Sequence, residues 1–145
     1  MMKLKAMFLC DSANVRDNLL SVLAGGLTRI GHANYPNNLQ ADLALMFEIF
    51  DGPADGHEVF VECVRIDEPE DPIFRFGGPV GTALDGTGKI LDIMNFPLVL
   101  PLESVGLPAP GMYQIRVELD GHRAGEIHFL ADVVDAGPGG LRESL

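Results

Sequence analysis

The sequence predicts an all-β protein, an antiparallel β-sandwich of the immunoglobulin-like class with about seven to nine strands and at most one short helix. Several segments alternate apolar and polar residues with a period of two, and runs of turn residues separate them. The 145 residues are close to the commonest size of one domain. We therefore expect a single domain over residues 1–134 and a disordered tail over 135–145.

The clearest strands are expected near the middle of the chain. Segment 40–50 places five apolar residues on one face, namely Ala41, Leu43, Leu45, Phe47 and Ile49. Segment 57–66 repeats the pattern with Val59, Val61 and Cys63. The run of turn residues at 51–56 suits a hairpin loop, so these two strands are expected to pair.

The N-terminal part predicts a first strand at 3–10, followed by an ambiguous segment at 12–24. That segment fits a helix capped by Ser12. It also fits a turn at Val15–Asn18 and a strand with a bulge at Gly25–Gly26. The strand is favoured, because the polar run before Leu19 is typical of a turn.

The region between 67 and 102 is less regular. Residues 67–87 read as a loop that begins with four acidic side chains. Segment 88–102 reads as one strand, or as two short ones broken at Pro97. A proline there predicts an edge strand or a bend.

The last two strands, 112–120 and 124–134, flank an Asp-Gly turn. A plain two-residue turn would pair Ile115 with Glu126 and place a carboxylate in the core. One extra residue, absorbed in a three-residue loop or in a bulge at Ala124–Gly125, pairs Ile115 with Ile127 instead. This register also places Arg116 opposite Glu126.

Charge and cysteine content limit the partners and the compartment. The formal net charge is −11, so we expect neither a nucleic-acid nor a membrane partner. The apolar run Ala6–Cys10 is shorter than the roughly 7–15 residues of a signal-peptide core. A cytoplasmic protein with Cys10 and Cys63 as reduced thiols is expected, with a disulfide between them as the alternative.

Motifs for catalysis, metals or cofactors are not apparent in the sequence. The four histidines form no metal-ligand spacing, and His122 and His128 would lie about 20 Å apart on a hairpin. The glycine-rich run at 81–90 lacks the Walker pattern, and no serine lies in a nucleophile elbow. We therefore expect no metal, no cofactor and no catalytic residue.

One surface is a candidate for protein interaction. The outward faces of 40–50 and 57–66 carry apolar side chains that would form a patch if nothing covers them, namely Ala44, Met46, Phe50, Phe60 and Val64. The alternative is that loop 67–87 or the first strands cover this face. The leading hypothesis is a non-enzymatic interaction or structural module that forms a homodimer or binds another protein. The alternative is a small-ligand binder or enzyme with a pocket between the sheets or under loop 67–87.

Several short motifs resemble those of an uncharacterised family of small, single-domain bacterial proteins, common in actinobacteria. They are Cys10-Asp11, Gly25-Gly26, Pro110-Gly111 with Tyr113, Asp120-Gly121, and Phe129. The resemblance covers most of the chain except 67–95, and the final hairpin is shared with many immunoglobulin-like modules. It implies a sandwich and no particular activity. Asn18-Leu19 departs from the Asp-Gly of the relatives, which keeps the helix alternative for 12–24 open.

Overall fold

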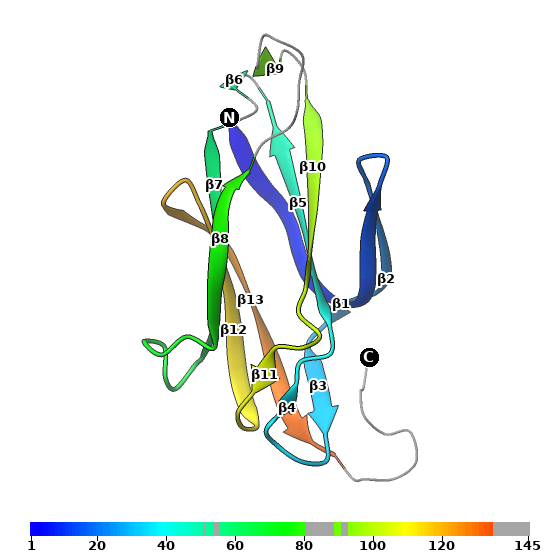
Figure 1. Cartoon of the computed structure of the whole chain (residues 1–145), viewed down its shortest axis with the longest axis vertical. Coiled ribbons are helices and arrows are strands. Elements are labelled where there is room, and N and C mark those ends of the chain that lie inside the picture. Colours follow the sequence, from blue (N-terminus) through cyan, green and yellow to red (C-terminus); the bar gives the residue numbers. More distant parts are fainter. Residues whose placement is uncertain (51, 54–55, 81–88, 91–92, 135–145) are drawn as a thin grey trace.

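The computed structural model describes all residues except 51, 54–55, 81–88, 91–92 and 135–145. The described residues form thirteen strands and no helix (Figure 1). Nine strands have four residues or more: β1 (Met2–Arg16), β2 (Leu19–Leu27), β3 (Arg29–His32), β5 (Asp42–Ile49), β7 (His57–Arg65), β8 (Phe74–Val80), β10 (Met94–Pro101), β12 (Gly111–Leu119) and β13 (His122–Val133). The other four have two residues each: β4 (Asn37–Asn38), β6 (Gly52–Pro53), β9 (Lys89–Ile90) and β11 (Gly106–Leu107).

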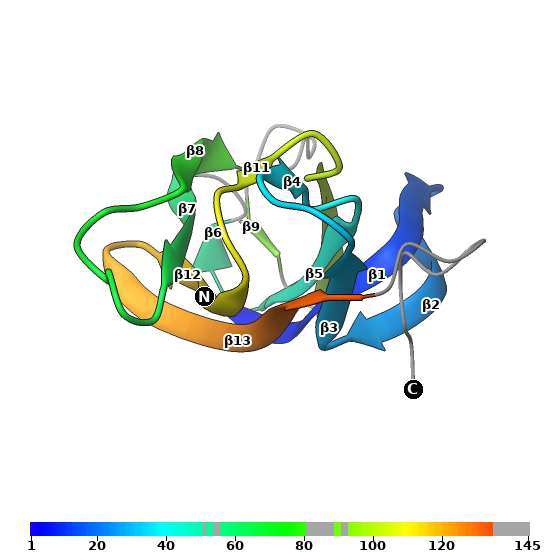
Figure 2. The same ribbon diagram turned by 90° about the horizontal axis from the view of Figure 1, so that it is seen from below.

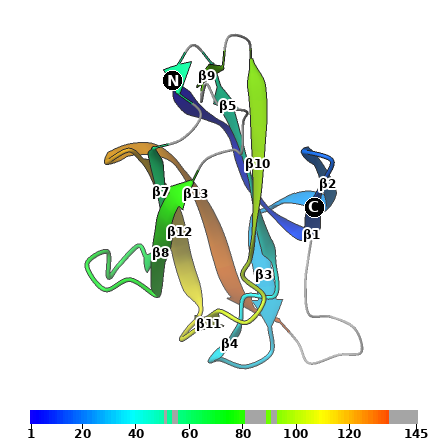
Figure 3. The same ribbon diagram turned by 45° about the horizontal axis from the view of Figure 1, so that its top comes forward.

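Two main sheets form the predicted sandwich. One has the strand order β10-β5-β1-β2, and the other has the order β3-β13-β12-β7-β8 and curls around one side of the molecule (Figures 2 and 3). The pairing is antiparallel throughout these sheets except between β13 and β3, which run parallel. The prediction of a purely antiparallel sandwich is corrected at this pair.

The strand order is that of an immunoglobulin-like domain. β5 and β10 take the places of strands B and E, and β7, β12 and β13 take those of C, F and G. β8 extends the second sheet next to β7, as strand C′ does in variable-type domains. The fold class expected from the sequence is therefore confirmed.

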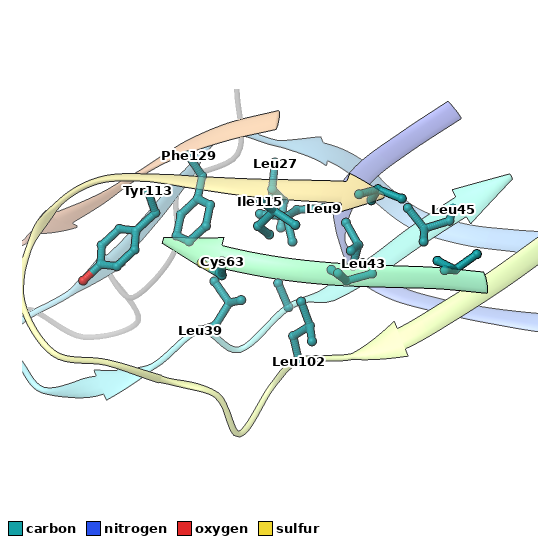
Figure 4. Packing of buried hydrophobic residues seen from close by; sticks show 14 of the residues in the cluster. Leu9, Leu27, Leu39, Leu43, Leu45, Cys63, Leu102, Tyr113, Ile115 and Phe129 are labelled. Atoms are coloured by element: carbon teal, nitrogen blue, oxygen red, sulfur yellow. The ribbon is translucent and has the colours of Figure 1, made fainter. Parts of the chain in front are cut away.

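The core lies between the two sheets and is built from the faces that the alternation predicted (Figure 4). All five predicted core residues of 40–50 are at most 1% exposed, as are Val61 and Cys63 on β7. On β13, Phe129 and Ala131 are buried as well, whereas Val133 is exposed at the end of its strand. Burial of these side chains is the main term that stabilises the sandwich.

The segment 12–24 is a hairpin, so the strand interpretation is confirmed and the helix is excluded. β1 continues to Arg16, which pairs with Leu19 across a two-residue turn. The turn residues Asp17 and Asn18 have φ values of 52° and 59°. Asp and Asn tolerate this left-handed conformation, which a type I′ turn requires at both positions.

The predicted bulge at Gly25–Gly26 is also present. Leu9 pairs with Leu27, whereas the next residue, Cys10, pairs with Gly25. Gly26 is the extra residue, and its φ of 90° suits a glycine. The bulge marks the point where β1 stops pairing with β5 and continues into the hairpin with β2.

The final hairpin absorbs its extra residue in a bulge rather than in a longer loop. Asp120 and Gly121 form a two-residue turn with φ values of 51° and 82°. The register shifts directly after Val117, where Ala124 is the additional residue on β13. Of the two solutions that the sequence allowed, this is the turn plus bulge.

The predicted register follows from that bulge. Ile115 lies opposite Ile127, and Arg116 lies opposite Glu126. The ion pair of Arg116 is nevertheless made with Glu62 on β7, at 3.1 Å between Nη1 and Oε1. β12 is a central strand, so its side chains have neighbours on both β13 and β7. The prediction from the sequence took only β13 into account.

Tyr113 closes the start of β12 in the manner of a tyrosine corner. Its hydroxyl donates to the carbonyl of Ala109, four residues upstream, at 2.6 Å. The ring is fully buried and stacks on Phe129 with the centroids 5.2 Å apart. The pairing of these two residues was predicted, and the hydroxyl bond was not.

Four further expectations concern the connections, the edge strand and the tail. β5 and β7 belong to different sheets, so the predicted hairpin between 40–50 and 57–66 is wrong. The region 67–87 contains a strand, β8, and is not only loop. β10 is an edge strand that passes unbroken through Pro97, which confirms the edge prediction. The expected disorder of 135–145 concerns residues outside the described part.

Candidate interaction surface

The structure separates the five residues expected to form one apolar patch. Ala44 and Met46 lie on β5 and Phe50 follows it, whereas Phe60 and Val64 lie on β7 in the other sheet. Ala44 and Val64 are fully buried, and the other three are half-buried. They do not form one continuous surface, because the chain crosses from one sheet to the other between the two strands.

Ala44 is buried on the outward face of the four-stranded sheet. It lies between Phe8 on β1 and Val99 on β10. The β1–β2 hairpin turns toward this face, and its tip residue Asn18 donates from Nδ2 to the carbonyl of Asn95 on β10 at 2.8 Å. The first strands thus approach this face, as one of the two alternatives in the sequence analysis expected.

Phe60 is covered within its own sheet. It lies opposite Gly77 on β8, where a Cβ atom would come within 3 Å of the Phe60 side chain. The guanidinium of Arg75 lies over the ring, 5.0 Å from its centroid. An aromatic residue over a cross-strand glycine is a common way to fill an edge of a sheet, so Phe60 has a structural role.

A different apolar surface is found on the hairpin of β1 and β2. We call residues 11–26 the arm. Figures 1 and 3 show it on the outer side of the four-stranded sheet. Four large apolar side chains of the arm are exposed: Val15, Leu19, Val22 and Leu23. Leu19 and Leu23 are the most open of these, with 68% and 64% of their surface in contact with solvent.

The pairing of the arm assigns these side chains to two faces. Leu19 and Leu23 share a face with Ser21, because residues two apart point to the same side of a strand. Val15 lies directly opposite Leu20, and both share the other face of the arm with Val22. The leucine face is the one with the greater exposure, and it carries no charge on β2.

Sequence reasoning missed this surface although the signal was present. The run from Asn18 to Thr28 contains no charged residue and no histidine. Its leucines do not by themselves indicate an exposed surface, because an apolar side chain is buried more often than not. Only the tertiary structure places this strand beyond β1, at the edge of the sheet.

The turn residue Asp120 of the final hairpin is bonded to the start of β7. Nδ1 of His57 lies 2.7 Å from a carboxylate oxygen of Asp120, and the amide of Glu58 donates to the other oxygen at 2.8 Å. Burial raises the pKa of Asp120, but the hydrogen bonds from His57 and Glu58 outweigh it and hold the pKa below its ordinary value. The contacts fasten the last turn to the start of β7.

A pocket of about 360 Å³ opens between the free edges of the two sheets. Val59 and Val61 line its floor, residues of β8 line one wall, and Leu98 and Leu100 of β10 line the other. None of the described residues that line it is titratable. These residues can therefore hold an apolar group but offer no acid, base or nucleophile.

Metal and thiol chemistry find little support in the described part of the chain. No group of three or more histidine, cysteine or acidic side chains there is arranged to hold a metal ion. Both cysteines are free and buried. Burial, with a smaller contribution from Glu62, raises the pKa of Cys63 to about 12, and burial followed by Asp42 raises that of Cys10.

Together these features define an immunoglobulin-like sandwich with a filled core and an apolar hairpin arm. A family model of proteins of unknown function (DUF6941) matches residues 5–132, and the chain belongs to that family. No curated protein matches the sequence. Among the described residues, no helix is long and apolar enough to cross a membrane.

Proposed function

We propose that this protein is a non-enzymatic interaction module that recognises a protein partner through the arm. The observation that carries the proposal is the exposure of Leu19 and Leu23 on one face of β2, a strand without charged residues at the edge of the sheet. Exposed apolar side chains gathered on one element are typical of interaction sites. Of the residues expected from the sequence to form such a site, Ala44 and Val64 are buried and the other three are half-buried.

The two leucines would supply part of the binding free energy. Complete burial of one leucine side chain contributes about 1.5–3 kcal/mol. Two of them would contribute about 3–6 kcal/mol, which corresponds to about two to four orders of magnitude in affinity. This is the contribution of a small hot spot at the centre of an interface.

Two features of the described part of the chain that resemble a site have structural explanations. The pocket between the sheets is lined by apolar residues, and the histidine–aspartate pair serves the last turn. We also place the protein in the cytoplasm, since two buried free thiols suit a reducing compartment.

The proposal is tested by photo-crosslinking in the cells that produce the protein. A photoreactive phenylalanine derivative replaces Leu23 in one variant and Met112 in a matched control, since Met112 is also exposed but lies on the other sheet. We expect adducts from position 23 that disappear when Leu19→Ser is added, and few from position 112. Equal adduct yields at the two positions, or none at position 23, would overturn the proposal.

The apolar pocket favours a second candidate function, the binding of a small apolar ligand. Its volume of about 360 Å³ falls within the range of ligand sites. Native mass spectrometry of the freshly purified protein should then show a bound apolar molecule that is lost in Leu98→Trp, which fills the pocket. A wild-type protein that carries no such molecule, and binds no fatty acid when one is added, would exclude this function.

A further inference from the structure

We propose that the partner of the arm is a second copy of this chain, joined edge to edge through β2. This inference rests on the proposed function, because it names the occupant of the same surface. The paired sheets would have the order β10-β5-β1-β2 followed by the same four strands of the second copy in reverse. Such addition of a strand to a free edge is a common mode of recognition.

β2 is the unprotected edge of the sandwich. Within the described part of the chain it pairs with β1 alone. Proteins usually protect edge strands with charge, proline or short length. β10 carries Pro97 and Pro101, β8 carries Arg75 and Pro79, and β3 has only four residues. β2 has nine residues and none of these devices.

The charge distribution favours this edge over other surfaces for contact with a second copy. Each chain carries a formal net charge of −11, so two copies repel each other at most approaches. The stretch from Asn18 to Thr28 is uncharged. Two copies that meet along β2 bring no like charges of this strand together, which is the condition for self-association of a strongly acidic protein.

The sequence of β2 is also complementary to itself. A two-fold axis through Ser21 places Ser21 opposite its own copy and Leu19 opposite Leu23 of the second chain. Directly opposite residues share a face, so the two most exposed leucines of each copy form apolar cross-strand pairs. On the other face, Leu20 lies opposite Val22. The contact is the same from both sides, as a closed dimer requires.

The regular part of β2 sets the extent of the contact. Ala24 has a φ of 54° and Gly26 one of 90°, so the strand departs from extended geometry after Leu23. Pairing is therefore confined to Leu19–Leu23, about 17 Å of strand. An interface of this size predicts a dimer that dissociates on dilution.

A charge-swap experiment tests the register. Sedimentation velocity measures the dimer fraction of the full chain. Protein concentrations between about 1 and 200 μM cover the dissociation constants of weak complexes. We expect a concentration-dependent dimer for the wild type. Ser21→Lys and Ser21→Asp should each be monomeric, because two like charges meet on the axis. An equimolar mixture of the two variants should form the dimer again.

Cysteine crosslinking supplies a second measurement with a matched control. Ser21→Cys should form a disulfide-linked dimer under mild oxidation. Asn14→Cys should not, because Asn14 is also exposed and lies directly opposite Ser21, but on β1, the other strand of the arm. The native cysteines are both buried and do not compete.

The outcomes separate this inference from the proposed function. A wild type that is monomeric throughout, a dimer that Ser21→Lys leaves intact, or equal crosslinking of the two cysteine variants overturns the inference. If photo-crosslinking at position 23 still yields adducts with another protein, the proposed function stands without it. If those adducts are missing as well, both fail.

Discussion

Gly77 is the position at which the structure predicts the largest effect of a single added methyl group. The Cβ atom of Gly77→Ala would lie 2.0 Å from the carbonyl oxygen of Val59 and 2.7 Å from the Cα of Phe60. Non-bonded heavy atoms prefer about 3.5 Å or more, so β8 must move away from β7 by about 1.5 Å at this point. Backbone hydrogen bonds do not tolerate such a displacement.

The expected cost is at the upper end of the range for overpacking, about 2–3 kcal/mol. Urea unfolding followed by circular dichroism measures it. With a slope of about 2 kcal/mol per molar urea, the midpoint should fall by about 1–1.5 M. Gly78→Ala is the matched control, because its Cβ meets nothing within 4 Å. We expect a change of at most about 0.5 kcal/mol there.

The reasoning is refuted if the two alanine variants unfold at the same urea concentration. A double variant extends the test, since the closest atoms belong to the backbone of β7. Removal of the ring by Phe60→Ala should therefore not restore the stability lost in Gly77→Ala. Full recovery would mean that the side chain of Phe60, at 2.9 Å, causes the clash.

Three further predictions concern the hydroxyl, carboxylate and thiol groups of the core and its rim. Tyr113→Phe removes the bond from the hydroxyl of a fully buried tyrosine to the carbonyl of Ala109 and should cost about 1–3 kcal/mol in thermal unfolding. The loss should exceed that of Tyr35→Phe, because Tyr35 is half-buried and water can replace its hydroxyl bond; equal losses would contradict this. Asp120→Asn should destabilise the protein at neutral pH, because a lowered folded pKa contributes stability above its ordinary value of 3.8. That contribution is lost as the pH falls through the folded pKa, so the difference from the wild type should shrink in acid denaturation, and a constant difference would argue against it. Cys10 and Cys63 should resist an aromatic disulfide reagent at pH 8 in the native protein and react in denaturant, and rapid native labelling of either would contradict their burial.

The local chemistry of turns and alternating strands was readable from the sequence. The faces of β5, β7 and β12 followed from their period of two, because a core-facing position must be apolar. The bulge at Gly25–Gly26 was expected from its glycine pair. The bulge at Ala124 was one of two solutions that the register of the final hairpin allowed, because one residue more or less turns an apolar face toward water. These are properties of neighbouring residues, which is why they could be predicted.

The assignment of strands to sheets was not readable in the same way. β5 and β7 show the same alternation and are joined by turn residues, as the strands of a hairpin would be, yet they lie in opposite sheets. Alternation tells which side chains share a face and not which strand is the neighbour. The same limit explains why Arg116 was assigned to Glu126 when its ion pair is with Glu62.

The sequence by itself determined the all-β class, the core faces, the positions of turns and bulges, and the absence of recognisable catalytic motifs. Only the tertiary structure shows that Leu19 and Leu23 of the arm are exposed, whereas Ala44 and Val64 are buried and Met46, Phe50 and Phe60 are half-buried. An exposed leucine and a buried one look alike in a sequence, since exposure depends on what the rest of the chain packs against that side chain. Here β2 lies at the edge of its sheet, and Leu19 and Leu23 remain in solvent.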